Sequence, residues 1–379
     1  MNAPVRISLG ERWRYPLLGC AARRLAVPAA RGAAVAVVTP GHLGDVLHAV
    51  PMLKALRNAK PGTKIVWLVG PWSAALARRY AGYVDEVRNF GPNLPNYARG
   101  KREWRQSAWS QWRLALDLRR TGIDVLIAPL DGAGRFLANA VCPRTWIGIG
   151  DRRPPRVRPE IATVVQPYEK DRYEADAWCG LLEPLGIAAR AERLVYEPTA
   201  AERQAADEFL RAEGVDPERP LAVIAPGSGW SGKNWLPARF AEVADWLVKE
   251  KGFQIAWVGG AGEEGLVPAP RRHDFNWVGR TSISLLAAVM ERAQLFVGND
   301  GGLLHFAAAQ GVPTVSIWGP TSPGKWGPKG PRHRQIRKAE RCDGCIYWDC
   351  RETCRHDRAC MKAVATADVL AAVREVWRE

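Results

Sequence analysis

Apolar residues follow two alternating patterns along the chain, short unbroken runs and stretches with the spacing of one helix face. Residues 33–38 form the first unbroken run, which predicts a strand buried on both faces of a sheet. Val46, Val50 and Leu53 then recur at helical spacing. Pro51 lies inside this stretch and predicts either a kink or a late start of the helix. A strand followed by a helix, repeated along the chain, predicts a parallel sheet covered by helices.

The same alternation continues through the first half of the chain. It predicts further strands at residues 65–69, 84–90, 125–128 and 146–149. Between them it predicts helices at residues 76–80, 104–118 and 135–141. The Arg- and Pro-rich residues 151–170 show neither pattern and predict a loop.

The pattern restarts in the second half of the chain. It predicts strands at residues 221–225, 253–258, 295–297 and 312–317. It predicts helices at residues 282–292 and 303–309, and another that begins near Pro237 and ends before Gly252. Residues 183–199 contain two prolines and weak periodicity, so we place the domain boundary there.

Two copies of one pattern predict two Rossmann-like α/β domains that face each other across a central cleft. The expected N-terminal domain comprises residues 32–190. The expected C-terminal domain comprises residues 191–379. A basic extension at residues 1–31 precedes them.

The composition is that of a globular protein, with 379 residues of which 47% are hydrophobic and 25% charged. No apolar run approaches the roughly 20 residues that span a bilayer, and the N-terminus lacks a signal-peptide pattern, so we expect a cytoplasmic protein. The net charge of +15 favours anionic partners. Because zinc-finger spacing, an RNP-like aromatic motif and Lys-rich runs are absent, we do not expect nucleic acid as a partner.

The first candidate loop follows the first predicted strand and leads into its helix. Its sequence Gly-His-Leu-Gly-Asp at 41–45 places Gly44 and Asp45 at the carboxyl end of that strand. An aspartate there can take a proton from an acceptor hydroxyl. It can equally cap the helix, and spacing alone does not separate the two roles.

The second candidate loop, residues 226–233, follows the first strand of the second half. Its small residues expose backbone N–H groups, and Ser228, Gly229 and Lys233 predict a cradle for a diphosphate. The spacing is not that of a Walker A loop. An ordinary flexible loop is the alternative interpretation.

The third candidate loop joins a predicted strand to a helix and contains Asp300, Gly301, Gly302 and His305. The N–H groups at the helix start, around Gly301 and Gly302, suit a phosphate. Asp300 suits sugar hydroxyls. His305 is either a ligand contact or a buried core residue.

Residues 260–265 match the dinucleotide pattern Gly-x-Gly-x-x-Gly. Two carboxylates, Glu263 and Glu264, stand where a pyrophosphate would have to lie, and they would repel it. We therefore interpret one of these glutamates as a partner for ribose hydroxyls instead.

Five of the eight cysteines cluster near the C-terminus. In a cytosolic protein such a cluster favours metal binding over disulfides, although the spacing is not that of a zinc knuckle. A structural zinc or iron ion and a metal-free structural loop are both open interpretations. The cluster, at 342–360, comprises Cys342, Cys345, Cys350, Cys354 and Cys360.

The three loops, taken in this order, resemble the heptosyltransferase family, which is glycosyltransferase family 9. The resemblance rests on Gly-Asp-Val-Leu-His at 44–48, on Ser228 with Lys-Asn-Trp-Leu-Pro at 233–237, and on residues 300–309. Trp-Gly-Pro-Thr at 318–321 and the cysteine-rich stretch are similar to segments of many members. The ordered combination is more specific than any single loop.

This resemblance implies a GT-B fold and an inverting glycosyltransferase that needs no metal cofactor. It implies ADP-heptose as the donor and a lipid-linked, anionic lipopolysaccharide core as the acceptor, reached by peripheral contact with the inner membrane. Asp45 is then the general base, and Gly44 and His48 lie beside the acceptor. Lys233 takes part in catalysis. The expected donor-binding residues are Ser228, Gly229, Lys233, Glu263, Glu264, Asp300, Gly301, Gly302 and His305.

Arginines of the first domain are expected to grip the anionic acceptor. The sequence does not choose among them, but we predict Arg135 as an acceptor-binding residue. The other candidates are Arg99, Arg102, Arg152 and Arg153.

Two other functions are consistent with the sequence. One is a heptosyltransferase that modifies an autotransporter protein and binds metal through the cysteine cluster. The other is a non-catalytic module that binds nucleotide sugars. A nicotinamide oxidoreductase is a more distant alternative, because the match at 260–265 is its only support.

Overall fold

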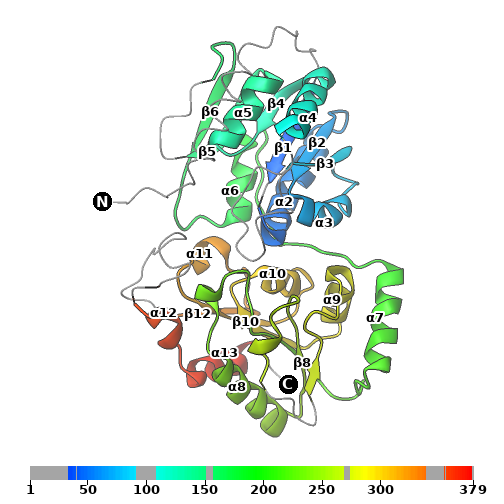
Figure 1. The fold of residues 1–379 in the computed structure, drawn as a ribbon, viewed down its shortest axis with the longest axis vertical. Helices are drawn as coiled ribbons and strands as arrows, with labels where there is room; N and C mark the ends of the chain where they lie inside the picture. Colours follow the sequence, from blue (N-terminus) through cyan, green and yellow to red (C-terminus); the bar gives the residue numbers. More distant parts are fainter. Residues whose placement is uncertain are drawn as a thin grey trace. The chain divides into compact units, whose positions relative to one another are not determined.

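The computed structural model describes residues 33–39, 41–90, 108–150, 157–268, 274–338, 354 and 356–377. The chain divides into two compact units, Met1–Glu192 and Arg193–Glu379. Each unit has one sheet of six parallel strands with helices packed on it (Figure 1). The predicted α/β class with two Rossmann-like domains is confirmed.

The first unit orders its strands β3-β2-β1-β4-β5-β6. These strands are β1 (Ala34–Thr39), β2 (Ile65–Val69), β3 (Glu86–Asn89), β4 (Ile123–Ile127), β5 (Thr145–Gly150) and β6 (Ala162–Pro167). The α-helices are α2 (Leu43–Ala59), α3 (Ala74–Arg78), α4 (Ala108–Thr121), α5 (Gly132–Val141) and α6 (Glu174–Gly180), with short 3-10 turns η1 (Pro71–Ser73) and η2 (Glu183–Leu185). Every residue of β1 and β2 is buried, as their unbroken apolar runs predict.

The sequence misleads at two places in this unit. Helix α2 starts before Pro51 and continues past it, so of the two predicted alternatives, a kink or a late start, the late start is wrong. Buried side chains on both sides of Pro51, such as Leu47 and Leu53, pack the helix onto the sheet, which offsets the hydrogen bond that proline cannot make. Residues 151–170 are not all loop, because β6 pairs with β5 along its whole length. As an edge strand, β6 is only partly buried and carries no unbroken apolar run.

The second unit orders its strands β12-β11-β10-β7-β8-β9. These strands are β7 (Leu221–Ala225), β8 (Gln254–Trp257), β9 (Asp274–Asn276), β10 (Leu295–Asn299), β11 (Thr314–Trp318) and β12 (His333–Arg337). The α-helices are α7 (Ala200–Ala212), α8 (Pro237–Lys251), α9 (Ile283–Met290), α10 (Gly302–Ala309), α11 (Pro323–Trp326), α12 (Ala359–Lys362) and α13 (Thr366–Val376), with 3-10 turns η3 (Ser231–Lys233) and η4 (Glu264–Leu266).

Helix α8 has both of the ends that the sequence predicts. Pro237 is its first residue, where a missing N–H costs nothing, and Gly252 ends it in the left-handed conformation with φ of 68°. Its apolar face, including Phe240 and Leu247, packs in one core with Val373 of α13. The two helices lie side by side on the sheet (Figure 1).

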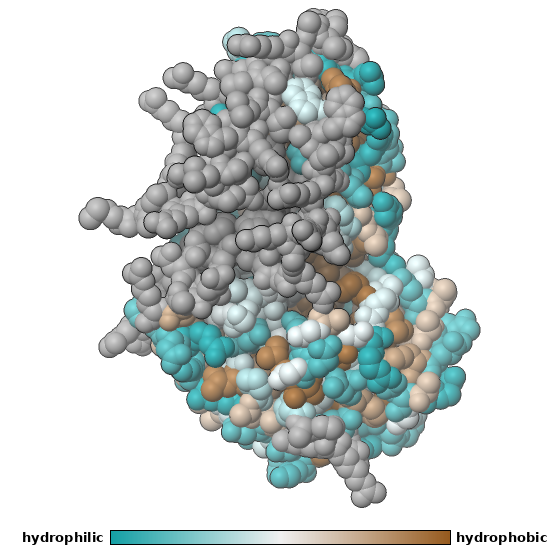
Figure 2. Space-filling view, viewed as in Figure 1, coloured by the Kyte–Doolittle hydropathy of each residue, from teal (hydrophilic) through white to brown (hydrophobic). Residues whose placement is uncertain are grey.

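The surface of the described residues carries few large exposed apolar side chains. Tyr168 is 44% exposed and Ile283 is 38% exposed. In the view of Figure 2, hydrophilic and apolar residues are mixed over the second unit. No helix in the described part of the chain is long and apolar enough to cross a membrane.

Candidate functional site

In both sheets the order in which the chain adds strands reverses at an equivalent point. In the first unit the chain builds outward from β1 to β3, then returns to place β4 on the other side of β1. In the second unit β7 and β10 are the corresponding pair. In open α/β sheets, ligands bind beyond the carboxyl ends of the strands at this reversal. The loops after β1 and β4, and those after β7 and β10, are therefore the candidate sites.

The point of the second unit where the strand order reverses holds an ion pair with a buried carboxylate. Asp300 directly follows β10 and is 5% exposed. Its Oδ2 accepts hydrogen bonds from Nζ of Lys233 at 2.9 Å and from Oγ1 of Thr321 at 2.7 Å. Burial alone would raise the pKa of Asp300, but the charge of Lys233 and these two hydrogen bonds hold that pKa below its usual value. The Lys233–Asp300 ion pair thus joins the loop after β7 to the loop after β10.

Asn299 ties the same two loops together through the backbone. Its Nδ2 donates to the carbonyl oxygen of Pro226 at 2.8 Å, and its Oδ1 accepts from the N–H of Trp235 at 2.9 Å. Neither Asn299 nor Thr321 is among the predicted site residues. A polar residue ending an otherwise apolar strand was a usable signal for Asn299, and the Trp-Gly-Pro-Thr segment at 318–321 was one for Thr321.

Ser228 and Gly301 lie next to each other in this site. The Ser228 hydroxyl lies 2.6 Å from Oδ1 of Asn234 and 2.7 Å from the carbonyl oxygen of Trp230. A methyl group at Gly301 would lie 3.7 Å from Cβ of Ser228, an ordinary contact. Gly229 is exposed, and space is open around it. Ser228 therefore orders the loop, and its expected contact with a ligand stays a prediction.

Helix α10 begins beside the ion pair. Gly301 precedes its first residue, Gly302, and His305 is buried one turn further on. A charge on His305 would help to lower the pKa of Asp300, although less than Lys233 does. The partial positive charge of a helix start and Lys233 thus lie at one end of β10, an arrangement that suits a diphosphate.

The two adjacent glutamates point to different neighbours. The Glu263 carboxylate accepts the N–H of Gly260 at 2.8 Å, and a methyl group at Gly227 would lie 2.4 Å from its carboxyl carbon. Glu263 thus reaches from the loop after β8 to the loop after β7. Glu264 accepts the N–H of Gly262 and lies beside Gly279, beyond β9. Glu263 is the glutamate that borders the candidate donor loop.

In the first unit, Asp45 folds back over the loop that carries it. Its Oδ2 accepts the N–H of His42 at 2.5 Å, so the carboxylate caps α2. A methyl group at Gly41 would lie only 2.0 Å from that oxygen, so this position requires glycine. Asp45 is half-buried at the carboxyl end of β1. The capping role expected as one alternative is present, and it leaves the catalytic role open.

The neighbouring residues of α2 are buried. His48 is fully buried; its Nδ1 lies 2.7 Å from the Gly44 carbonyl oxygen, and its ring meets Tyr173 edge-on. Because a carbonyl only accepts, Nδ1 is the protonated nitrogen in this contact. His48 thus stabilises the start of α2, and its expected contact with an acceptor stays a prediction.

Arg135 lies in the first turn of α5, directly after β4. Asp131 caps this helix by accepting the N–H groups of Ala133 and Gly134, each at 2.9 Å. The Nε of Arg135 is buried and has no hydrogen-bond partner among the described residues. The other candidate arginines, at 99, 102, 152 and 153, lie outside the described residues.

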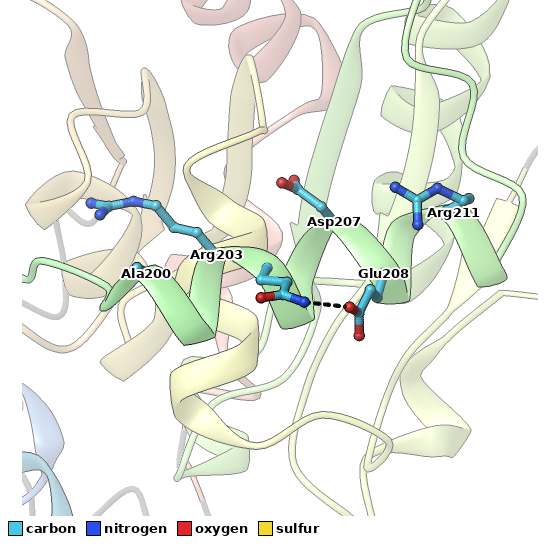
Figure 3. A pocket seen from close by; sticks show the side chains of 6 residues that line it. Ala200, Arg203, Asp207, Glu208 and Arg211 are labelled. Carbon is cyan, nitrogen blue, oxygen red and sulfur yellow. Dashed lines mark hydrogen bonds between the residues drawn. The ribbon is translucent and has the colours of Figure 1, made fainter.

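A groove of about 500 Å³ runs along α7 of the second unit. Its lining consists of α7 side chains, including Arg203, Asp207 and Glu208 (Figure 3). Arg203 pairs with Glu291, and Asp207 pairs with Arg292 beyond α9. These charges fasten α7 to the end of α9, so the groove offers no separate chemistry.

The cysteine cluster falls mostly outside the described residues, since only Cys354 and Cys360 are placed. Cys360 is buried, and a methyl group at Gly319 would lie 3.0 Å from its sulfur. The part of the chain that the structure describes contains no group of three His, Cys, Asp or Glu residues that could hold a metal ion.

The chain has clear relatives. Residues 175–356 match glycosyltransferase family 9 (heptosyltransferase). Lipopolysaccharide heptosyltransferase 1 of Pseudomonas aeruginosa is 25% identical over 337 residues, which cover 83% of this chain and 87% of that protein.

Solved structures share the fold. A family 9 glycosyltransferase from Veillonella parvula superposes with a TM-score of 0.71 at 23% identity, covering 92% of this chain and 98% of that one. The ADP-heptose lipopolysaccharide heptosyltransferase II of Escherichia coli gives 0.66 at 19% identity, covering 90% and 98%. The predicted GT-B fold class and the resemblance to the heptosyltransferase family are confirmed.

Proposed function

We propose that the protein, a glycosyltransferase similar to the family 9 heptosyltransferases, transfers heptose from ADP-heptose to a lipopolysaccharide core acceptor with inversion. The names of its relatives support the substrates. The observation that carries the proposal is the Lys233–Asp300 ion pair beside the start of α10.

The second unit binds the donor. An ammonium group has three N–H donors, and Asp300 uses one of those of Lys233, which leaves two for diphosphate oxygens. The start of α10 at Gly302 and the hydroxyl of Ser228 flank the same position, and Glu263 accepts from ribose hydroxyls. His305, Gly301 and Gly229 complete the donor loops.

The first unit binds the acceptor, and Asp45 takes the proton of its hydroxyl. The hydroxyl oxygen forms a bond to the anomeric carbon of heptose while the bond to the diphosphate breaks on the opposite face. ADP leaves with the bonding electrons, and Lys233 with the α10 start stabilises the growing charge. Each step uses side chains of this chain alone, so we propose that transfer continues in the presence of a chelator.

Arg135 binds an anionic group of the acceptor. Its buried Nε has no hydrogen-bond partner in the part of the chain that the structure describes, and an anion would supply the missing acceptor. The acceptor is lipid-linked in this proposal, so the protein works at the cytoplasmic face of the inner membrane. The net charge of +15 favours peripheral contact with an anionic lipid surface.

A transfer assay tests the proposal. Purified protein is mixed with ADP-heptose and a deacylated lipopolysaccharide core, ADP release is followed, and the product linkage is assigned by NMR. We expect one heptose added per ADP released, with the opposite anomeric configuration. ADP binding without transfer to this acceptor or to an autotransporter protein would contradict the enzyme assignment, and retained configuration would contradict the single displacement.

Replacement of the proposed base isolates its role. Asp45→Asn keeps a side chain that can accept the His42 N–H, but it cannot take a proton. We expect the turnover rate to fall about 10²- to 10⁴-fold. Asp368→Asn is the matched control, because Asp368 accepts the N–H of Ala365 at 2.8 Å at the same position of α13. If both variants turn over at the wild-type rate, Asp45 is a capping residue only.

A further inference from the structure

An indole from the loop after β2 holds the loop that carries Asp45. Trp72 lies in η1, and its Nε1 donates a hydrogen bond to the carbonyl oxygen of Gly41 at 2.9 Å. The two residues are 31 positions apart, and they meet because β1 and β2 are neighbours in the sheet. This contact links the ends of two adjacent parallel strands.

The Trp72 ring is fixed in place by the loop beneath it. A methyl group at Gly70 would lie 2.5 Å from Cζ2 of Trp72, so the ring lies directly against the Gly70 backbone. Gly70 has φ of −60° and ψ of 145°, a conformation that any residue adopts. Glycine is therefore required there for space and not for backbone freedom.

The hydrogen bond from Trp72 acts on the same peptide unit that holds Asp45. The Gly41 carbonyl and the His42 N–H belong to one planar peptide, since the bond between them does not rotate. Trp72 donates to the carbonyl end, and the N–H end donates to Oδ2 of Asp45. The indole thus fixes the orientation of the N–H that orients the carboxylate, and hydrogen bonds in such a chain strengthen each other.

We propose that Trp72 is a positioning residue for the Asp45 carboxylate. The inference rests on the proposed role of Asp45 as general base. Trp72 acts through the Gly41–His42 peptide and holds the carboxylate toward the acceptor hydroxyl. Small displacements of a reacting group lower the rate strongly, whereas they leave binding at the other unit unchanged.

Trp72→Phe tests the proposal, because it keeps a ring over Gly70 and removes only the N–H. We expect kcat to fall about tenfold, with the KM for ADP-heptose, the Kd for ADP and the melting temperature unchanged. Trp178→Phe is the matched control. Trp178 is half-buried on α6 of the same unit, and its Nε1 has no hydrogen-bond partner within the described residues.

A second variant displaces the ring without removing the indole. Gly70→Ala places a methyl group where the Trp72 ring lies, and the backbone accepts alanine. We expect the same tenfold loss of kcat. If Gly70→Ala and Trp72→Phe both retain wild-type kcat, Trp72 has no positioning role.

The double variant Trp72→Phe/Asp45→Asn separates this inference from the function proposed above. If Trp72 acts through Asp45, removing the indole from the Asp45→Asn enzyme lowers kcat no further. An additive loss would overturn the positioning role while Asp45 stays the base. A normal rate in Asp45→Asn itself would instead contradict the base assignment.

Discussion

The candidate site loops lie at equivalent points of the strand order in the two units. Different interactions hold these loops in position in each unit. In the second unit an ion pair between Lys233 and the buried Asp300 joins the loops after β7 and β10. In the first unit, Trp72 and Asp45 hold the Gly41–His42 peptide of the corresponding loop by hydrogen bonds. Topology therefore fixes where a site can form, and side chains decide which ligand it takes.

A second difference lies in the loop that follows the second strand of each sheet. After β2, Trp72 donates an N–H to the backbone of the first-strand loop. In the loop after β8, the Glu263 carboxylate packs against Gly227, which lies in the loop after the first strand, β7. Both loops support the neighbouring one, but only the second also presents an acceptor suited to hydroxyl groups. The comparison predicts a diphosphate sugar at the second unit and a hydroxyl acceptor at the first.

Among the tests of this comparison, the largest effect is expected from removing the cation of the second unit. Lys233→Met is expected to lower kcat about 10²- to 10³-fold, because the leaving diphosphate loses a stabilising charge. ADP affinity, measured by calorimetry, is expected to fall as well. Lys249→Met, on the exposed side of α8, is the control and keeps wild-type values. Equal ADP affinity in both variants would refute the donor role of Lys233.

The next effect concerns stability. Lys233→Met leaves the Asp300 carboxylate buried without its partner, and we expect a loss of about 3–5 kcal/mol in the free energy of unfolding. The double variant Lys233→Met/Asp300→Asn removes both charges and is expected to recover most of that loss without recovering activity. Chemical denaturation of the three proteins measures this. A double variant as unstable as the single one would show that the pair is not the cause.

The same pair predicts a pH dependence with a definite sign. In the wild type the pKa of Asp300 is held below its usual value, so its stabilising contribution is present above about pH 4 and is lost as pH falls through the lowered pKa. In Lys233→Met the Asp300 carboxyl keeps the Thr321 hydrogen bond but loses the charge of Lys233. We expect burial then to raise its pKa, so the carboxyl destabilises increasingly as pH rises above about 4. The stability gap between the two proteins should shrink from pH 7 to pH 4. A constant gap would exclude the linkage.

The smallest effect is expected at Arg135. Arg135→Gln should raise the KM for a phosphorylated acceptor about tenfold, as expected for one lost charge-assisted hydrogen bond, and leave the KM for ADP-heptose unchanged. Removing the acceptor's phosphates should abolish the difference. Arg120→Gln, on the exposed side of α4, is the control. A matching rise in the donor KM would place Arg135 outside acceptor binding.

The sequence by itself determined the elements whose residues carry a local pattern. Strands β2 and β7 have the predicted bounds, because every residue in each is buried and apolar. Helix α8 has the predicted ends, because Pro237 and Gly252 act on their own backbone. The three loops also lie at the predicted strand ends.

Tertiary structure alone decided what depends on strand order and exposure. Edge strands such as β6 and β12 are half-exposed, so they lack the apolar run that marks a central strand. Lys233 meets Asp300 across 67 positions, and Trp72 meets Gly41 across 31, because β7 adjoins β10 and β1 adjoins β2. A sequence pattern indicates which residues are buried and which are exposed to water. It does not indicate which distant residues a sheet brings together.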